Sequence, residues 1–257
     1  MKVLFEPSEN PYSSIYISYC VDMRERHYCQ AIQEITTNTG KSTTPPQAAG
    51  YKIGVQPIHS PQAAGNTTLR DLIDFGVFSK NAVRLLVSSK MTRRGPFQGV
   101  RLVQGEIHDP EAMLDRVWDI IGKPSVEVKS LLLDAGVQNR SRIMIEMPEP
   151  IMDTIVESLW KMFKWLLPLC LGVNTLGLTA ASKILFSIFP EIALPVEKSQ
   201  WKDLFQTVDY TDIIYLMRAE ISEWEKRSQK RLNDCDPFGS FTLPVFYNAA
   251  AMLAVQP

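Results

Sequence analysis

Four positively charged side chains fall close together in the first half of the chain, and together they could hold an anion. They are Lys90, Arg93, Arg94 and Arg101. Arginine binds phosphate or carboxylate oxygens through parallel hydrogen bonds, and lysine adds a point charge, so this run suits a phosphate group or a nucleic-acid backbone. The alternative is a solvated turn, because exposed charges stabilise little without a partner. The sequence favours the solvated turn and leaves the anion site open.

Residue types that carry metal or nucleophilic chemistry occur without the usual spacings. The histidines are His27, His59 and His108. His27 lies near Cys20 and Cys29, but their spacing matches no common zinc site. The chain has no GxSxG, GxxxxGK[ST] or GxGxxG motif. Cys170 lies in an apolar stretch that disfavours a thiolate. We therefore expect no metal, no cofactor and no nucleotide-driven reaction.

A segment in the second half carries a longer pattern. Residues 171–186 read LGVNTLGLTAASKILF, and Pro190 and the run LPVE at 194–197 follow. This segment resembles the helix-hairpin-helix region of DNA glycosylases. It also resembles bacterial helical proteins with a Ser-Lys-x-Leu helix, for which the resemblance implies no activity. In the glycosylases a glycine-containing turn precedes a helix whose free N–H groups hold a DNA phosphate, and a catalytic aspartate follows.

The resemblance to glycosylases implies a set of site residues. Those that would contact phosphate are Gly172, Asn174, Thr175, Lys183, Arg93 and Arg94. Glu197 stands where the family has its catalytic aspartate and would act as acid or base. Lys183 lies two positions before the Schiff-base lysine of bifunctional members, and Asn174 replaces the second glycine of the turn. The alternative is a packed helical hairpin in which Lys183 is paired with an acid or extends to solvent.

The first half of the chain mixes strand and helix patterns. Strand patterns occur at 15–21, 51–55, 100–103 and 142–147, and helix patterns at 22–36, 68–75, 79–89, 109–122 and 125–134. Ser79 and Asp109 are the expected N-caps, and Gly122 is the expected helix stop. Residues 37–67 are polar and repeat Pro-Gln-Ala-Ala-Gly at 46–50 and 61–65. This composition predicts a surface insertion.

Helical periodicity dominates the second half. We expect a helix from about 149 that ends near Pro168 and Gly172, and others at 175–189, 199–208, 211–232 and 244–255. Residues 165–182 lack charge, but Pro168, Gly172 and Asn174 interrupt them. We therefore expect two buried helices there and no membrane span.

The sequence thus predicts a mainly α (α+β) fold, in which a mixed part (1–148, with the 37–67 insertion) packs on a helical part (149–257). The formal charge of −1 gives no overall attraction to nucleic acid. Unpatterned cysteines and the short apolar stretch before Glu6 point to the cytoplasm. We expect a non-enzymatic macromolecule-binding protein with a protein partner, and second a DNA glycosylase-like nucleic-acid-binding protein, active or degenerate. The sequence leans against an enzyme and gives no oligomeric state.

Overall fold

The computed structural model describes residues 74–135, 137, 142–172, 177–198, 200–235 and 242–254, with two short strands at 47–48 and 51–52. The strands are β1 (Gln47–Ala48), β2 (Tyr51–Lys52), β3 (Arg101–Val103) and β4 (Glu106–His108). The helices are α3 (Phe75–Ser88), α4 (Met113–Asp134), α5 (Ile143–Glu146), α6 (Glu149–Cys170), α7 (Leu178–Ile188), α8 (Tyr210–Ser228) and α9 (Leu243–Ala254), with a π-helical turn η2 (Gln200–Phe205) and a 3-10 turn η3 (Leu232–Cys235). The predicted elements at 15–21 and 22–36 lie outside the described residues, as do most of the predicted helix at 68–75 and most of the predicted insertion at 37–67.

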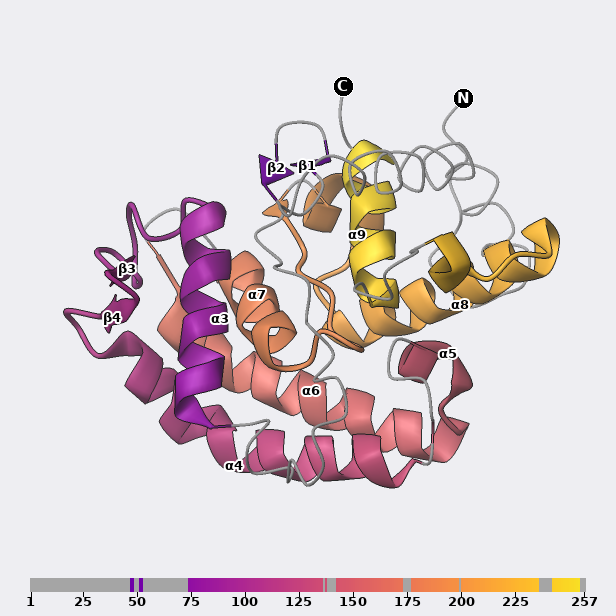
Figure 1. Ribbon diagram of the computed structural model, residues 1–257, viewed down its shortest axis with the longest axis horizontal. Helices are drawn as coiled ribbons and strands as arrows, with labels where there is room; N and C mark the ends of the chain where they lie inside the picture. Colours follow the sequence, from indigo (N-terminus) through magenta and orange to yellow (C-terminus); the bar gives the residue numbers. More distant parts are fainter. Residues whose placement is uncertain are drawn as a thin grey trace.

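The described residues form a mainly α structure, as the sequence predicts. One apolar core runs from α3 to α9, and its members include Leu86, Leu114, Phe163 and Ile213. Helix α7 lies inside the molecule, with α3 and α6 packed against it (Figure 1). Every residue of α7 from Ala180 to Ile188 is buried. The first and second parts of the chain therefore share one core.

The two described sheets are small antiparallel hairpins. In β3–β4, Leu102 pairs with Ile107, and both side chains lie against the core. The turn between the strands uses Gln104 and Gly105, both with positive φ (52° and 88°). Positive φ at both central residues matches the twist of a two-residue hairpin. The strand predicted at 100–103 is confirmed, and the side chain of Arg101 on it is exposed.

Helix α3 begins four residues before its predicted start. Asp74 is the N-cap, and its Oδ1 accepts a hydrogen bond from the Val77 N–H at 2.7 Å. Ser79, the expected N-cap, lies inside the helix and donates its hydroxyl to the Gly76 carbonyl at 3.2 Å. An aspartate satisfies free N–H groups at a helix start as well as serine does, and Asp74 takes the place predicted for Ser79.

Helix α4 corrects two predictions, because it begins at Met113 and continues through Gly122 and Pro124. Asp109 does not cap the predicted first turn; its Oδ2 accepts from the Leu114 N–H at 2.7 Å. Gly122 does not end the helix. A Cβ at this position would lie 2.9 Å from the Trp118 ring, so the glycine lets the indole pack flat against the helix.

The strand predicted at 142–147 is also wrong, because residues Ile143–Glu146 form the short helix α5. Ile143, Met144 and Met147 are buried. Two adjacent buried residues and a third three positions later follow a helical period, whereas a strand would bury alternate residues. The apolar content of the segment therefore indicated burial correctly and the element type incorrectly.

The uncharged stretch at 165–182 forms parts of two helices, as predicted. Helix α6 ends at Cys170 and α7 begins at Leu178. Gly177 has φ +74°, and a Cβ there would lie 3.0 Å from the Cys170 carbonyl carbon. Only glycine combines this φ with so close an approach at low cost. No helix in the described ranges is long and apolar enough to cross a bilayer.

Helix α9 lies within one residue of its predicted position, whereas α8 begins as predicted to within one residue and ends at Ser228, before its predicted end at 232. Within the predicted helix at 199–208 the structure has the π-helical turn η2. The apolar residues that α8 buries are Ile213, Ile214, Leu216, Met217, Ile221 and Trp224. Glu220 of the same helix is also fully buried.

Candidate phosphate-binding site

A buried, irregular segment at residues 190–198 supplies one wall of the site. It follows α7 and crosses the core, where Leu194 and Val196 are fully buried. Buried backbone groups need partners. The Tyr210 hydroxyl donates to the Leu194 carbonyl and accepts from the Leu194 N–H, both at 2.8 Å. The Ser182 hydroxyl accepts from the Val196 N–H at 3.0 Å. These contacts fix the segment next to α7.

Two lysine–glutamate pairs also join this segment to neighbouring helices. Near its start, Lys129 of α4 donates to Glu191 at 3.0 Å, and both side chains are almost fully buried. Near its end, Lys183 of α7 forms an ion pair with Glu197 Oε1. Buried ion pairs cost desolvation that their attraction only partly returns. Their presence at both ends of one segment shows how tightly its position is fixed.

Lys183 also contacts α3, because its ammonium group donates to the Ser89 hydroxyl. Ser89 is the C-cap of α3. The Lys183 side chain is 3% exposed, whereas that of Glu197 is 21% exposed. Burial lowers the pKa of the Lys183 ammonium, and the Glu197 carboxylate opposes that shift. The pair therefore lies at the border of the core, with the carboxylate on the outer side.

The backbone of Glu197 is held by a second set of polar contacts. Its N–H donates to Gln200 Oε1 at 2.6 Å, and Gln200 Nε2 donates to Asn248 Oδ1 at 3.1 Å. Gln200 begins η2 and is fully buried, and Asn248 belongs to α9. The main chain of Glu197 is thus fixed, and its carboxylate is held by Lys183.

Ser89 is not arranged as a nucleophile. Its hydroxyl donates to the Leu85 carbonyl at 2.7 Å and accepts from Lys183. A serine nucleophile must give its proton to a base, but here the proton points to a carbonyl that cannot take it. Lys183, the candidate Schiff-base lysine, is paired with Glu197. The candidate catalytic residues Lys183 and Glu197 therefore neutralise each other.

Ser89 opens the turn that carries the cations singled out by sequence. Lys90 follows it with φ +60°, and Gly95 has φ +85°. The Arg93 N–H donates to the Lys90 carbonyl at 3.4 Å, and the Gly99 N–H to the Thr92 carbonyl at 3.0 Å. We call residues 89–95 the basic turn. Its compact backbone holds three exposed cationic side chains just beyond the C-terminal end of α3.

The basic turn belongs to a larger acid-free region that the sequence analysis missed. Residues 75–105 contain no aspartate or glutamate and six cations. These are Lys80, Arg84, Lys90, Arg93, Arg94 and Arg101, and all six are exposed. Because the whole chain carries −1, the remaining residues carry −7 against +6 here. Counting acids across the whole region, and not only cations in the run, would have found it.

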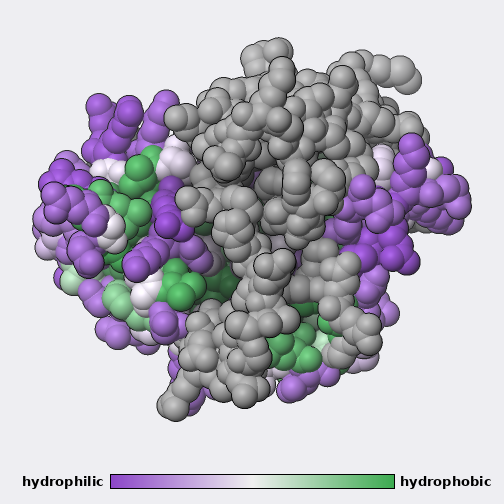
Figure 2. Space-filling view, in the orientation of Figure 1, coloured by the Kyte–Doolittle hydropathy of each residue, from purple (hydrophilic) through white to green (hydrophobic). Residues whose placement is uncertain are grey.

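The side chains of these six cations have no hydrogen bond or ion pair among the described residues. In Figure 2, hydrophilic atoms mix with hydrophobic patches over the left part of the face, where Figure 1 places α3 and the β3–β4 hairpin. The exposed valines of this region are Val77, Val87 and Val103. The region is therefore cationic with apolar points between its charges.

The structure thus brings together only some of the predicted phosphate-binding residues. Lys183 touches Ser89 at the start of the basic turn, and Arg93 and Arg94 are exposed in that turn. Gly172 lies just after α6. Asn174 and Thr175 lie outside the described residues, so their predicted role has no structural description.

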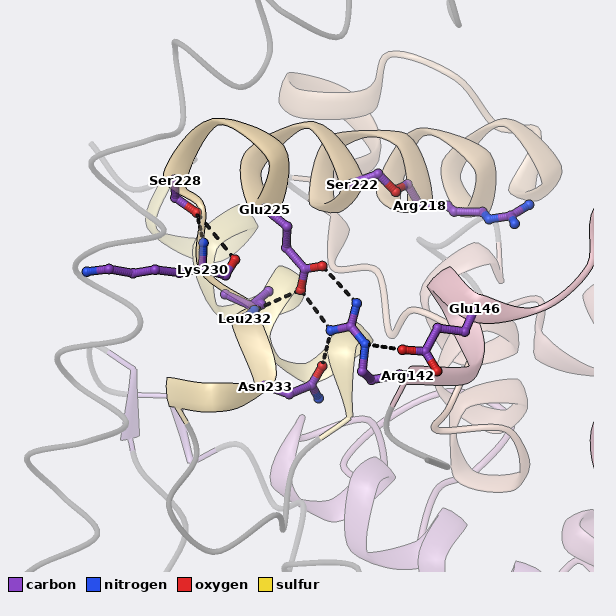
Figure 3. Close-up of polar contacts among 9 residues, drawn as sticks. All are labelled: Arg142, Glu146, Arg218, Ser222, Glu225, Ser228, Lys230, Leu232 and Asn233. Atoms are coloured by element: carbon purple, nitrogen blue, oxygen red, sulfur yellow. Dashed lines mark hydrogen bonds and ion pairs between the residues drawn. The ribbon is translucent and has the colours of Figure 1, made fainter. Parts of the chain in front are cut away.

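A second cluster is centred on Arg142 (Figure 3). Figure 1 places α5, next to this residue, on the opposite side of the view from α3. Its guanidinium donates to both Glu225 oxygens at 2.8 and 2.9 Å, to Glu146 at 2.7 Å and to Asn233 at 2.9 Å. The Leu232 N–H also donates to Glu225, at 2.8 Å. The hydrogen bonds that Arg142 donates to Glu225 raise the pKa of Arg142, against the effect of burial. The cluster joins α5, α8 and η3 and leaves little hydrogen-bonding capacity for a ligand.

No group of histidine, cysteine, aspartate and glutamate suited to a metal occurs among the residues that the structure describes. Comparison with known proteins adds no assignment: no family model, curated protein or solved structure matches the chain. What can be said of function therefore rests on the chain's own residues.

Proposed function

We propose that this chain is a non-enzymatic macromolecule-binding protein and that it binds nucleic acid through the cations of residues 75–105. The observation that carries the proposal is the set of six exposed cations in a region with no acid, none of them paired with a residue that the structure describes. Cations on a protein surface release the counterions of a nucleic-acid backbone, and this release drives sequence-independent binding. The net charge of −1 on the whole chain does not oppose this binding, because the field near a surface depends on local charges.

The interaction does not require a catalytic group. Lys183 and Glu197 are paired, and the Ser89 proton is directed to Leu85. A binding role for the basic turn uses the exposed Lys90, Arg93 and Arg94 directly. The turn's internal hydrogen bonds reduce the conformational freedom that would be lost on binding.

The proposal is tested by titrating a labelled DNA duplex of about 20 base pairs by fluorescence anisotropy at several salt concentrations between about 50 and 200 mM. We expect binding that weakens steeply with salt. The test variant is Lys90→Gln/Arg93→Gln/Arg94→Gln. It should bind about ten-fold or more weakly, and its plot of log K against log salt should be shallower by about 2 to 3, since each phosphate contact contributes about 0.9.

A matched control removes three exposed cations elsewhere, as Lys226→Gln/Lys230→Gln/Arg231→Gln at and beyond the end of α8. The charge change equals that of the test variant, so an effect of net charge alone would be equal in both. An equal loss of duplex affinity in the two variants, or no binding of the duplex by the native protein at about 50 mM salt, would contradict the proposal.

A protein partner, the first expectation from sequence, is the second candidate. It is favoured by two large apolar side chains near the end of α6: Trp165 is 49% exposed and Leu171 is 55% exposed. Exposed tryptophan is enriched at protein interfaces. In the titration above, a protein-binding role predicts no salt-dependent affinity for the duplex and no effect of the Lys90, Arg93 and Arg94 changes.

A further inference from the structure

The Lys183 ammonium is a buried cation in contact with the first residue of the basic turn. It touches the Ser89 hydroxyl, and Ser89 precedes Lys90 in the chain. An ammonium group beside a run of exposed cations would add a strong contact to a bound phosphate. In this structure its charge is directed to Glu197 instead.

The Glu197 carboxylate occupies the position in which a phosphate oxygen would meet Lys183. Both groups present an anionic oxygen that accepts from an ammonium. Glu197 uses Oε1 for this contact. Its side chain is seven times as exposed as that of Lys183, at 21% against 3%, so the carboxylate separates the ammonium from water.

Rotation of the Glu197 side chain alone would uncover the ammonium. The main chain at this point is fixed, because the Val196 N–H donates a hydrogen bond to Ser182 and the Glu197 N–H donates one to Gln200. Lys183 is likewise fixed at its base by the fully packed helix α7. The exchange therefore needs new side-chain rotamers and no movement of a helix or of the 190–198 segment.

We infer that Lys183 and Ser89 form a phosphate subsite that Glu197 covers, and that a phosphate group bound at the basic turn displaces the carboxylate. The inference rests on the proposed function for its nucleic-acid ligand. Free phosphate or pyrophosphate has the same chemistry, and the experiments below separate the two sources. In the covered state Glu197 is an internal competitor, so it lowers the affinity of the site.

The first experiment uses Glu197→Gln in the duplex titration. Glutamine keeps the size of the side chain and removes its charge. We expect affinity to rise about three-fold to ten-fold and the salt slope to steepen by about 1, because one more cation then contacts phosphate. In the double variant Lys183→Met/Glu197→Gln the gain should disappear. Unchanged or weaker binding by Glu197→Gln, with an unchanged slope, would show that the pair only positions the turn and would overturn the inference.

The second experiment uses sodium pyrophosphate alone as the probe, with sodium chloride of equal ionic strength as reference. We expect pyrophosphate to raise the melting temperature of Glu197→Gln by about 3 °C or more, and that of the double variant by much less. This readout is independent of DNA. If the native protein does not bind duplex, the proposed function fails, and equal pyrophosphate shifts in the two variants would then overturn the subsite as well.

A Glu197→Asp variant guards against loss of folding in Glu197→Gln. The shorter side chain keeps the charge but withdraws the carboxylate from Lys183 by about one methylene length. It should show a smaller gain of the same sign in both experiments, and no gain in either would contradict the subsite.

Discussion

The sequence singled out Lys183 and Glu197 as candidate site residues, but it did not show which residues they contact. Lys183 lies in a helix in which every other residue from Ala180 to Ile188 is also buried. A lysine there requires a partner, because an unpaired buried charge is strongly disfavoured. The resemblance singled out Glu197 as well. Neither pattern indicated that the two would pair, since 14 residues and an irregular segment separate them.

Ser89 was missed for a related reason. A serine at the end of a helix has the local hydrogen bond to Leu85 as its ordinary explanation. Its second contact, from Lys183, joins residues 94 positions apart. Periodicity and spacing carry no information on such contacts. A lysine within a run of buried residues indicates that a partner exists, and only the fold identifies that partner.

Cys170 permits a test of burial at the scale of one side chain. Burial raises the pKa of its thiol to about 12 from an ordinary value of 9.0. Above pH 9 the unfolded chain loses this proton and the folded chain keeps it. The contribution of the buried thiol to stability is therefore fully present below pH 9. It is lost as pH rises toward 12, by about 1.4 kcal/mol per pH unit.

We expect the stability difference between the native protein and Cys170→Ala to be constant up to about pH 8.5 and then to shrink by that amount per unit up to about pH 11. Urea unfolding at each pH measures it. Groups such as Tyr210, whose pKa burial also raises, are present in both proteins and cancel. Parallel curves for the two proteins at all pH values would contradict the raised thiol pKa.

At the scale of elements, sequence patterns located most helices but misplaced some of their ends. The helices from 149 onward followed a strong 3.6-residue period and were predicted well. The predictions were wrong where the same residue type or pattern occurs in two kinds of local structure. Gly122 lies within α4 because it contacts Trp118, although glycine more often ends a helix. The strand prediction at 142–147 failed because a short apolar run fits either element.

The contact of α5 with α8 depends on the Arg142 cluster shown in Figure 3. The Arg142 side chain is 6% exposed and satisfies both Glu225 and Glu146. Arg142→Met would leave the Glu225 carboxylate partly buried without its main partner. We expect a loss of about 3 to 5 kcal/mol in the free energy of unfolding, measured by urea titration.

Lys161→Met provides the matched comparison for this change. Lys161 pairs with Glu157 four residues earlier at 2.7 Å, and the side chains of both are more than half exposed. Solvent screens such a pair, so its loss should change stability by no more than about 0.5 kcal/mol. Similar effects of the two substitutions would show that the Arg142 cluster contributes no more than a surface pair.

At the scale of the whole molecule, the sequence predicted the mainly α class and the packing of the two parts, but not which helices meet. Residues on both sides of position 148 belong to the same core: α4 packs on α6, and α3 packs on α7. These contacts follow from side-chain complementarity between helices far apart in sequence. A pattern read along one helix shows that a face is buried and cannot identify the helix that covers it.

A shared core makes a definite prediction for unfolding. If α3 and α8 are stabilised by the same cluster, loss of packing in either should destabilise both parts equally. Leu86 in α3 and Ile213 in α8 are fully buried. We expect Leu86→Ala and Ile213→Ala each to lower stability by about 2 to 5 kcal/mol, with a single transition and an unchanged dependence on denaturant.

The measurement is urea unfolding followed by far-ultraviolet circular dichroism, which reports all helices, and by tryptophan fluorescence, which reports local surroundings. Trp118 in α4 and Trp224 in α8 place fluorescent probes on both sides of position 148. In each variant we expect the two signals to report the same transition. The helices on both sides of position 148 share one core, so neither side can unfold while the other stays folded. If Leu86→Ala instead split the transition while Ile213→Ala only shifted it, the part before position 148 would be an independent folding unit, and the cross-packing of α3 on α7 would contribute little to stability.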